Sequence, residues 1–203
     1  MKHRPVLVVL ILLLSACATV PAGSPPATIG EVDLTRFSGQ WYEVARFTTP
    51  FQDGLDGRCE DVTATYTPRS DGAMDVVNRC RDAANGGQER IARGVARSAS
   101  PGNDRLRISF QWPVSGDYWV IGLDPDYRWA VVGAPGRDQL RILSRTPVLP
   151  AGAYSMAVAM ARREGFVTAR LVPTPQRATE SARALRFERA LLPRTMIYGA
   201  GRA

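Results

Sequence analysis

Apolar and polar side chains alternate in short runs between residues 41 and 145, and turn-forming residues separate these runs. Alternation with a period of two is typical of a β-strand that buries one face. The pattern predicts eight strands, at residues 41–47, 59–67, 73–80, 88–96, 105–112, 118–123, 128–133 and 139–145. Because hairpin-sized loops join most of them, we expect an all-β fold, an eight-stranded antiparallel up-and-down β-barrel, with a β-sandwich as the main alternative.

The spacing of apolar residues changes after the eighth predicted strand. Small and apolar residues then recur at spacings of three and four, at Ala153, Met156, Ala157, Met160 and Ala161. This stripe predicts an α-helix over 150–164 that packs on the outside of the sheet. Gly165 is suited to end the helix, and residues 166–172 are expected to form a short ninth strand.

Residues 48–58 form the one long connection between predicted strands. They are polar and rich in proline and glycine, with Phe51 and Leu55 as the apolar exceptions. A loop of this length could fold over a barrel opening as a lid, or pack as an ordinary surface loop. The sequence leaves both readings open.

Two cysteines lie on the second and third predicted strands. Residues 59–67 and 73–80 flank a turn signal at 68–72. A four-residue hairpin loop places Cys59 opposite Cys80 on one face, with Cβ atoms at about the separation a disulfide needs. We therefore predict a Cys59–Cys80 disulfide, with a pair of free thiols as the alternative.

The N-terminus reads as an export signal. A positively charged start and a short apolar run lead to Leu14-Ser15-Ala16-Cys17, which resembles the lipobox of bacterial lipoproteins. The resemblance implies removal of residues 1–16 and acylation of Cys17 with chains such as palmitate, which would anchor the chain to the membrane. A secretory signal with a chance cysteine is the alternative. Residues 17–32 are expected to be a flexible tether, and Ala18 after the cysteine suggests the outer membrane.

The amino-acid composition limits the kinds of catalysis and metal binding that the chain can support. The only histidine, His3, and the only lysine, Lys2, fall in the signal, so the remaining chain has neither a histidine base or metal ligand nor a Schiff-base lysine. An enzyme, a metal site and a cofactor are therefore disfavoured. The net charge of +7 becomes +5 without the signal, and +4 of this lies in residues 177–203, a basic extension that is either helical or disordered. The barrel is nearly neutral, which argues against nucleic-acid binding.

One aromatic residue has an expected structural partner. Gly39 permits a tight turn just before Trp41 at the start of the first strand. In an eight-stranded meander the first and last strands are neighbours, so Arg145 can place its guanidinium over the Trp41 ring. We expect these three residues to plug one end of the barrel rather than contact a ligand.

Three ordered motifs resemble a known family. Gly39-Gln40-Trp41, the turn Asp124-Pro125-Asp126-Tyr127, and Arg145 within residues 143–147 are similar to the three conserved motifs of the lipocalins. Further stretches and the lipobox resemble the bacterial outer-membrane lipoprotein members, relatives of apolipoprotein D. The resemblance covers about 33–175, so we expect a barrel domain at 33–176. It implies a cup that binds a hydrophobic ligand, a fatty acid or a lysophospholipid.

The ligand contacts are expected near the open end of the cup. The candidates are its aromatic and apolar side chains, Phe47, Phe51, Leu55, Phe110, Trp112 and Tyr118. Glu43 and Arg141 should pair if both face the interior, because an unpaired buried charge is costly. Two other functions stay open: a structural envelope protein with a filled barrel, and an enzyme on this scaffold with Glu43 as its acid. The natural ligand and the oligomeric state are not determined by the sequence.

Overall fold

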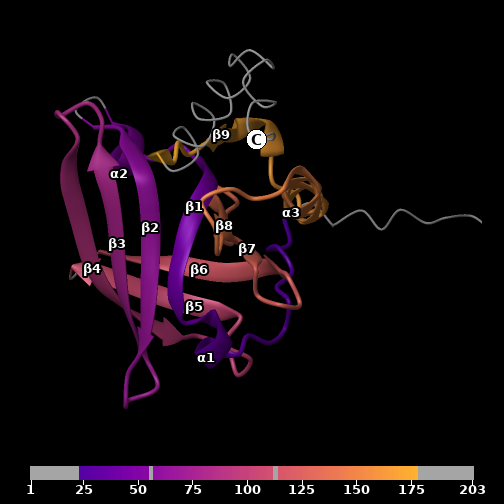
Figure 1. The fold of residues 1–203 in the computed structure, drawn as a ribbon. Helices are drawn as coiled ribbons and strands as arrows, with labels where there is room; N and C mark the ends of the chain where they lie inside the picture. The colour runs from indigo at the N-terminus through magenta and orange to yellow at the C-terminus, as the bar shows by residue number, and fades with distance from the viewer. Residues whose placement is uncertain (1–22, 55–56, 112–113, 178–203) are drawn as a thin grey trace, which may run out of the picture.

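The computed structural model describes residues 23–54, 57–111 and 114–177 (Figure 1). The signal, Cys17, Leu55, Trp112 and residues 178–203 therefore lie outside the described part of the chain. Within the described ranges, no helix has the length and apolar character needed to cross a membrane.

Eight strands form a closed antiparallel barrel. They are β1 Gly39–Phe47, β2 Cys59–Pro68, β3 Met74–Asp82, β4 Gln88–Ser98, β5 Arg105–Gln111, β6 Val114–Leu123, β7 Trp129–Gly133 and β8 Leu140–Ser144. Each strand pairs with the next in the chain, and β1 pairs with both β2 and β8, which closes the sheet. The predicted up-and-down barrel is confirmed. Short helices lie at its two ends, α1 Leu34–Phe37 at one and α2 Pro50–Asp53 at the other (Figure 1).

The ninth strand pairs with the end of β1. The first half of β1 pairs with β2, but its last three residues pair instead with β9, Leu171–Pro173. Just beyond β9, Gln176 donates its side-chain amide to the carbonyl oxygens of Glu43 on β1 and Val62 on β2, at 3.0 and 3.2 Å. The strand is shorter than the expected 166–172, because a 3₁₀ turn, Thr168–Arg170, precedes it.

Helix α3, Ala151–Arg163, covers one side of the barrel as expected (Figure 1). Ala157 and Ala161 are fully buried, and α3 packs on the outer faces of β6 and β7. Met156, expected in the packing stripe, is instead 54% exposed. Two alanines on one face bring the helix close to the sheet, so Met156, one position before Ala157, points outward.

The disulfide is confirmed, but the predicted hairpin register is wrong. Cys59 lies opposite Asp82, and Cys80 is its diagonal neighbour on the same face, with Cα atoms 5.3 Å apart. Strand β2 runs on to Pro68, and a β-bulge between Glu60 and Thr63 inserts one extra residue. Such a bulge bends its strand, and here Asp61 takes a left-handed φ of 51°.

The expected flexible tether is ordered over its second half. Ile29 and Val32 donate backbone hydrogen bonds to the carbonyl oxygens of Val120 and Gly102, at 3.1 and 2.7 Å. Val32 is 1% exposed and packs at the α1 end of the barrel. Residues 27–32 are therefore held against the barrel by backbone hydrogen bonds and by the buried Val32 side chain.

Candidate functional site

The α1 end of the barrel is closed by aromatic packing. Trp41 is fully buried, donates its indole N–H to the Phe37 carbonyl at 2.8 Å, and stacks on the Phe37 ring at 4.9 Å. The Arg145 guanidinium carbon lies 3.7 Å from the centre of the Trp41 ring. Arg145 also donates to the carbonyls of Arg36 and Gln40, at 2.7 and 3.0 Å. The structure thus brings Trp41 and Arg145 together at the closed end.

Gly39 and the 124–127 turn support this closed end. Gly39 has a φ of 89°, a left-handed value that side chains other than glycine rarely adopt. Tyr127 accepts a hydrogen bond from the Asp33 amide at 2.9 Å, and Arg36 lies 4.1 Å above its ring. The three motifs that carry the family resemblance therefore meet at one end of the molecule.

Above this floor, a cluster of apolar and aromatic side chains lies in the barrel interior. Its members come from all eight strands and include Tyr66, Met74, Val76, Ala96, Leu106, Ile108, Tyr118, Val120, Val132 and Leu143. Phe110 packs against this cluster while partly exposed. The cluster provides the apolar environment that a hydrophobic ligand requires.

A hydrogen bond crosses the interior. The Tyr66 hydroxyl on β2 donates to the Tyr118 hydroxyl on β6 at 2.8 Å. These strands lie four places apart around an eight-stranded barrel, so the bond joins opposite walls. Burial raises the pKa of Tyr66 to about 12 and the pKa of Tyr118 well above its usual value. Both phenols therefore stay protonated at neutral pH, and their bond crosses the interior near the closed end, where the Tyr66 ring packs against Phe37 with ring centres 5.4 Å apart.

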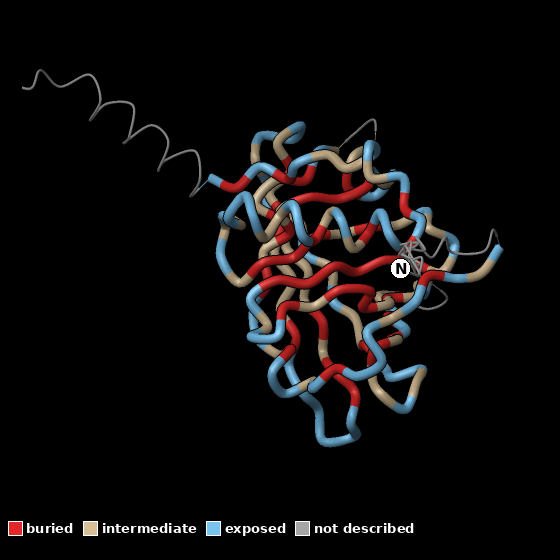
Figure 2. Tube along the Cα trace, turned by 90° about the vertical axis from the view of Figure 1, so that its right-hand side faces the viewer, coloured by how far each residue is buried: buried red, intermediate tan, exposed pale blue. Residues whose placement is uncertain are grey.

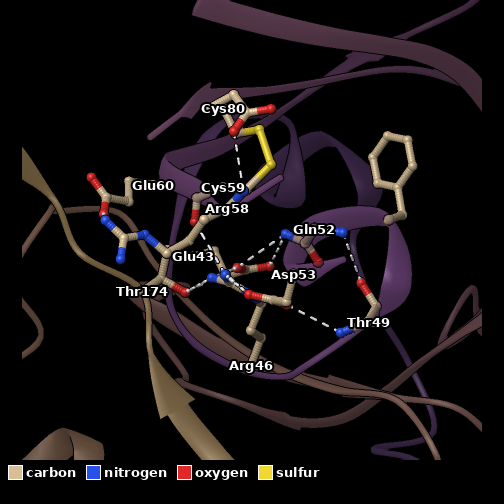
Figure 3. Close-up of polar contacts among 12 residues, drawn as sticks. Glu43, Arg46, Thr49, Gln52, Asp53, Arg58, Cys59, Glu60, Cys80 and Thr174 are labelled. Carbon is tan, nitrogen blue, oxygen red and sulfur yellow. Dashed lines mark hydrogen bonds and ion pairs between the residues drawn. A yellow bond between two sulfur atoms is a disulfide. The ribbon is translucent and has the colours of Figure 1, made fainter. Parts of the chain in front are cut away.

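A buried polar cluster lies at the opposite end of the barrel, beneath α2 (Figure 3). Arg46 is 2% exposed and uses every N–H group of its guanidinium. It binds Asp53 of α2 through two nitrogens, and it donates to Glu43 at 3.2 Å, to the Thr174 hydroxyl at 2.7 Å and to the Cys59 carbonyl at 3.1 Å. One side chain thus connects β1, α2, β2 and the segment after β9.

Glu43 is the acidic centre of this cluster. It is 3% exposed and pairs with both Arg46 and Arg141, at 3.2 Å each. The expected Glu43–Arg141 pair is therefore present. Gln52 of α2 donates to Glu43 at 3.3 Å and accepts from Arg141 at 3.3 Å, so the 48–58 connection reaches into the barrel opening. Asp53 is held charged: partial burial opposes ionisation, but hydrogen bonds from Arg46 and the Thr49 amide lower its pKa.

A hollow of about 970 Å³ lies outside this cluster. It is lined by residues of the 48–57 connection together with Asp82 and Arg90. Phe51 is 62% exposed at its edge, and the Arg90 guanidinium lies 4.8 Å from the centre of its ring. The hollow is a recess beside the α2 segment, lined by both charged and apolar side chains.

The expected ligand contacts separate in the structure. Tyr118 lies in the interior, Phe110 packs at its margin, and Phe51 lies outside at the hollow. Phe47 does not face the interior: it packs against Phe166 on the outer side, with ring centres 6.4 Å apart. A β-bulge between Glu43 and Ala45 explains this, because it turns Arg46 inward and Phe47 outward.

Several interior residues were missed by the sequence reasoning. Tyr66, Arg46 and Gln52 were not singled out, although the aromatic–threonine alternation of β2 could have indicated an inward Tyr66. Arg46 gives no comparable signal, since a charged residue on a strand is normally exposed. Among the described residues, no group of three or more acidic, histidine or cysteine side chains is placed to hold a metal ion.

Comparisons with known proteins agree with this architecture. The model of the lipocalin-like domain family matches residues 32–176. "Outer membrane lipoprotein Blc" of Escherichia coli K12 is 36% identical over 160 residues, which cover 79% of this chain and 88% of that protein. "Temperature-induced lipocalin-1" of Arabidopsis thaliana is 36% identical over 159 residues, covering 73% and 81%.

Solved structures agree on the fold. Insecticyanin from the tobacco hornworm Manduca sexta superposes with a TM-score of 0.58 at 16% identity, over 77% of this chain and 86% of that one. Lobster apocrustacyanin A1 gives 0.56 at 18% identity, over 78% and 93%. With a family model over most of the chain and relatives at 36% identity, this protein belongs to the lipocalin family.

Proposed function

We propose that this protein is a lipid-anchored lipocalin of the bacterial outer membrane that binds a fatty acid or a lysophospholipid inside its barrel. The lipobox-like sequence ending at Cys17 supports the anchor, and relatives named as outer membrane lipoproteins support the location. The anchor would place a ligand-binding barrel next to a source of single-chain lipids.

One observation carries the choice of ligand. The interior is apolar beside Trp41 at the closed end, the Tyr66–Tyr118 hydrogen bond crosses it, and the Glu43–Arg141 ion pair lies at the opposite end. A molecule with a long apolar chain and one polar end matches this distribution. Its head group could bind Arg141, and its chain could pack against the apolar side chains of the interior. Phe110 and Tyr118 are the initial candidates that remain near such a ligand.

The test is a direct titration of the non-acylated mature chain, with Cys17→Ser, against oleate and lysophosphatidylethanolamine. Saturable binding of one ligand per chain, with a change in tryptophan fluorescence, is the expected result. Arg141→Gln should weaken binding of either ligand, whereas Arg107→Gln on the outer surface should not. Failure of both ligands to bind would refute the proposal.

The tyrosine bond makes a more specific prediction. An acyl chain that extends past the tyrosine pair toward the closed end must break the Tyr66–Tyr118 hydrogen bond. This bond contributes about 0.5–1.5 kcal/mol net. The double variant Tyr66→Phe, Tyr118→Phe should therefore bind a long-chain fatty acid about two- to tenfold more tightly, as measured by fluorescence titration. Tyr154→Phe on α3 is the matched control. Unchanged affinity in the double variant would show that the ligand stays above the tyrosine pair.

A filled structural barrel is the second candidate, and the same bond favours it. A direct link between opposite walls shows that the chain's own side chains meet across the interior. If neither the parent nor the double phenylalanine variant binds a single-chain lipid, this second function replaces the first. An enzymatic role is not proposed, because the relatives are named as lipoproteins and lipocalins and no catalytic group stands out beside Glu43.

A further inference from the structure

We propose that the outer face of helix α3, with the residues that flank it on both sides, is a docking surface for anionic lipid bilayers. We call this surface the α3 face and define it by Val148, Met156, Arg162, Val167 and Arg170. It goes beyond ligand binding, since it concerns how the barrel lies on its membrane. The step that uses the distance between Cys17 and the barrel rests on the acyl anchor of the proposed function.

Exposed apolar side chains concentrate on this face. Val148, Met156 and Val167 are 53%, 54% and 61% exposed, and they make up half of the six large apolar side chains most exposed among the described residues. The other exposed positions of α3 before Arg162 are small and uncharged, namely Ala151, Gly152, Ser155 and Ala159. Figure 2 views the molecule from the side that carries α3. A flat, uncharged helix face is unusual on the solvent side of a helix, where charged residues normally predominate.

The exposed charges of the segment 148–171 have one sign. Between residues 148 and 171 the basic residues are Arg162, Arg163 and Arg170, and the only acidic residue is Glu164. Glu164 is 6% exposed and its carboxylate accepts hydrogen bonds from the Ala27 amide and from Arg163. The exposed charge of the face is therefore positive, as attraction to an anionic bilayer requires.

A shallow hollow lies within the α3 face. It has a volume of about 560 Å³ and lies between the second half of α3 and the turn at 168–171. Its lining includes the apolar side chains of Val158, Phe166 and Leu171 together with Arg162. Acyl-chain contacts beside a guanidinium match the boundary between lipid head groups and tails.

The anchor leaves the domain beside this face. The Ala27 amide donates a hydrogen bond to the carboxylate of Glu164, the residue that follows α3, at 2.9 Å. Cys17 lies ten positions before Ala27, and ten residues span at most about 35 Å even when fully extended. The α3 end is thus the part of the barrel that an acylated Cys17 holds closest to the membrane.

The test compares two matched variants of the Cys17→Ser chain, including residues 178–203. One carries Arg162→Glu and Val167→Ser on the α3 face. The other carries Arg93→Glu and Ile91→Ser on β4, also one exposed arginine and one exposed apolar residue, on the side away from α3 (Figure 1). Binding is measured by flotation with vesicles of phosphatidylcholine that contain phosphatidylglycerol, and with phosphatidylcholine alone.

We expect the α3 variant to bind the anionic vesicles about tenfold more weakly than the parent, and the β4 variant to bind about as well as the parent. Equal binding by both variants, as the basic extension alone would produce, would overturn the proposal. So would a parent chain that does not bind anionic vesicles more than neutral ones.

A second measurement avoids charge reversal. Met156→Cys and Ile91→Cys, each labelled with a polarity-sensitive dye, are mixed with the same vesicles. The dye at position 156 should shift to the blue, and the dye at 91 should not; equal shifts would overturn the proposal. Oleate titration of these variants and mass spectrometry of the native N-terminus report separately on the ligand and anchor of the proposed function.

Discussion

Replacing Arg46 by methionine is expected to lower the free energy of unfolding by about 3–5 kcal/mol. The substitution keeps most of the side-chain volume but leaves Glu43 without one of its two arginines and Asp53 without its main partner. A buried charge that loses its partner retains its desolvation cost, so the loss exceeds that of an ordinary hydrogen bond. Urea unfolding followed by tryptophan fluorescence would measure the effect.

The same variant should also release α2 from the barrel opening. Arg46 connects to α2 through Asp53, so its loss removes the main charged link between β1 and the 48–58 connection. Limited proteolysis should then cut this connection faster than in the parent. Arg58→Met is the control, because its ion pair with Glu60 involves a side chain that is 66% exposed and should contribute less than about 1 kcal/mol. Equal destabilisation by the two variants would contradict this account.

Trp41→Ala is expected to cost about 3–5 kcal/mol, the usual range for removal of a large buried aromatic side chain. The ring has no exposure and fills the closed end between Phe37 and Arg145. Arg145→Ala should be destabilising as well, because it also removes hydrogen bonds to backbone carbonyls of α1 and β1. Thermal unfolding or urea titration of both variants would measure these losses.

The double mutant tests whether the two side chains act together. With both replaced, the loss should be smaller than the sum of the single losses by about 0.5–2 kcal/mol, the worth of the shared cation–π contact. Trp119 and Arg105 on the outer surface form a matched pair at 4.5 Å, where the coupling should lie at the low end of this range. Strict additivity at Trp41 and Arg145 would mean that their contact contributes no stability.

Much of the fold could be predicted because strands and helices leave periodic patterns in the sequence. The eight strands, the α3 helix and the Cys59–Cys80 bond followed from alternation, spacing and turn residues. The Trp41–Arg145 contact followed from topology, since closure of the barrel makes β1 and β8 neighbours. These features depend on local preference and on the order of strands, and both are present in the chain itself.

The orientation of side chains beyond a bulge could not be predicted in this way. Alternation assigns faces only while the period of two is unbroken, and one inserted residue reverses every face that follows. The bulge after Glu43 turned Phe47, which was expected to face the interior, to the outer side and brought Arg46 inside.

The hairpin register differs for another reason: Pro68 pairs with Met74, so the turn spans five residues and Thr67 lies opposite Asp75, and the bulge beside Asp61 then shifts the pairing by one residue. The disulfide still forms because diagonal neighbours share a face.

The sequence by itself determined that this chain forms a lipocalin barrel with a tryptophan–arginine closed end, a disulfide and one outer helix. Only the tertiary structure decided which polar residues the barrel buries. Arg46 is stable inside because Asp53, Thr174 and the Cys59 carbonyl reach it from three other segments. Such partners are distant in sequence, and no periodic pattern of apolar and polar residues identifies them. The polar site at the barrel opening therefore forms only when folding brings these segments together.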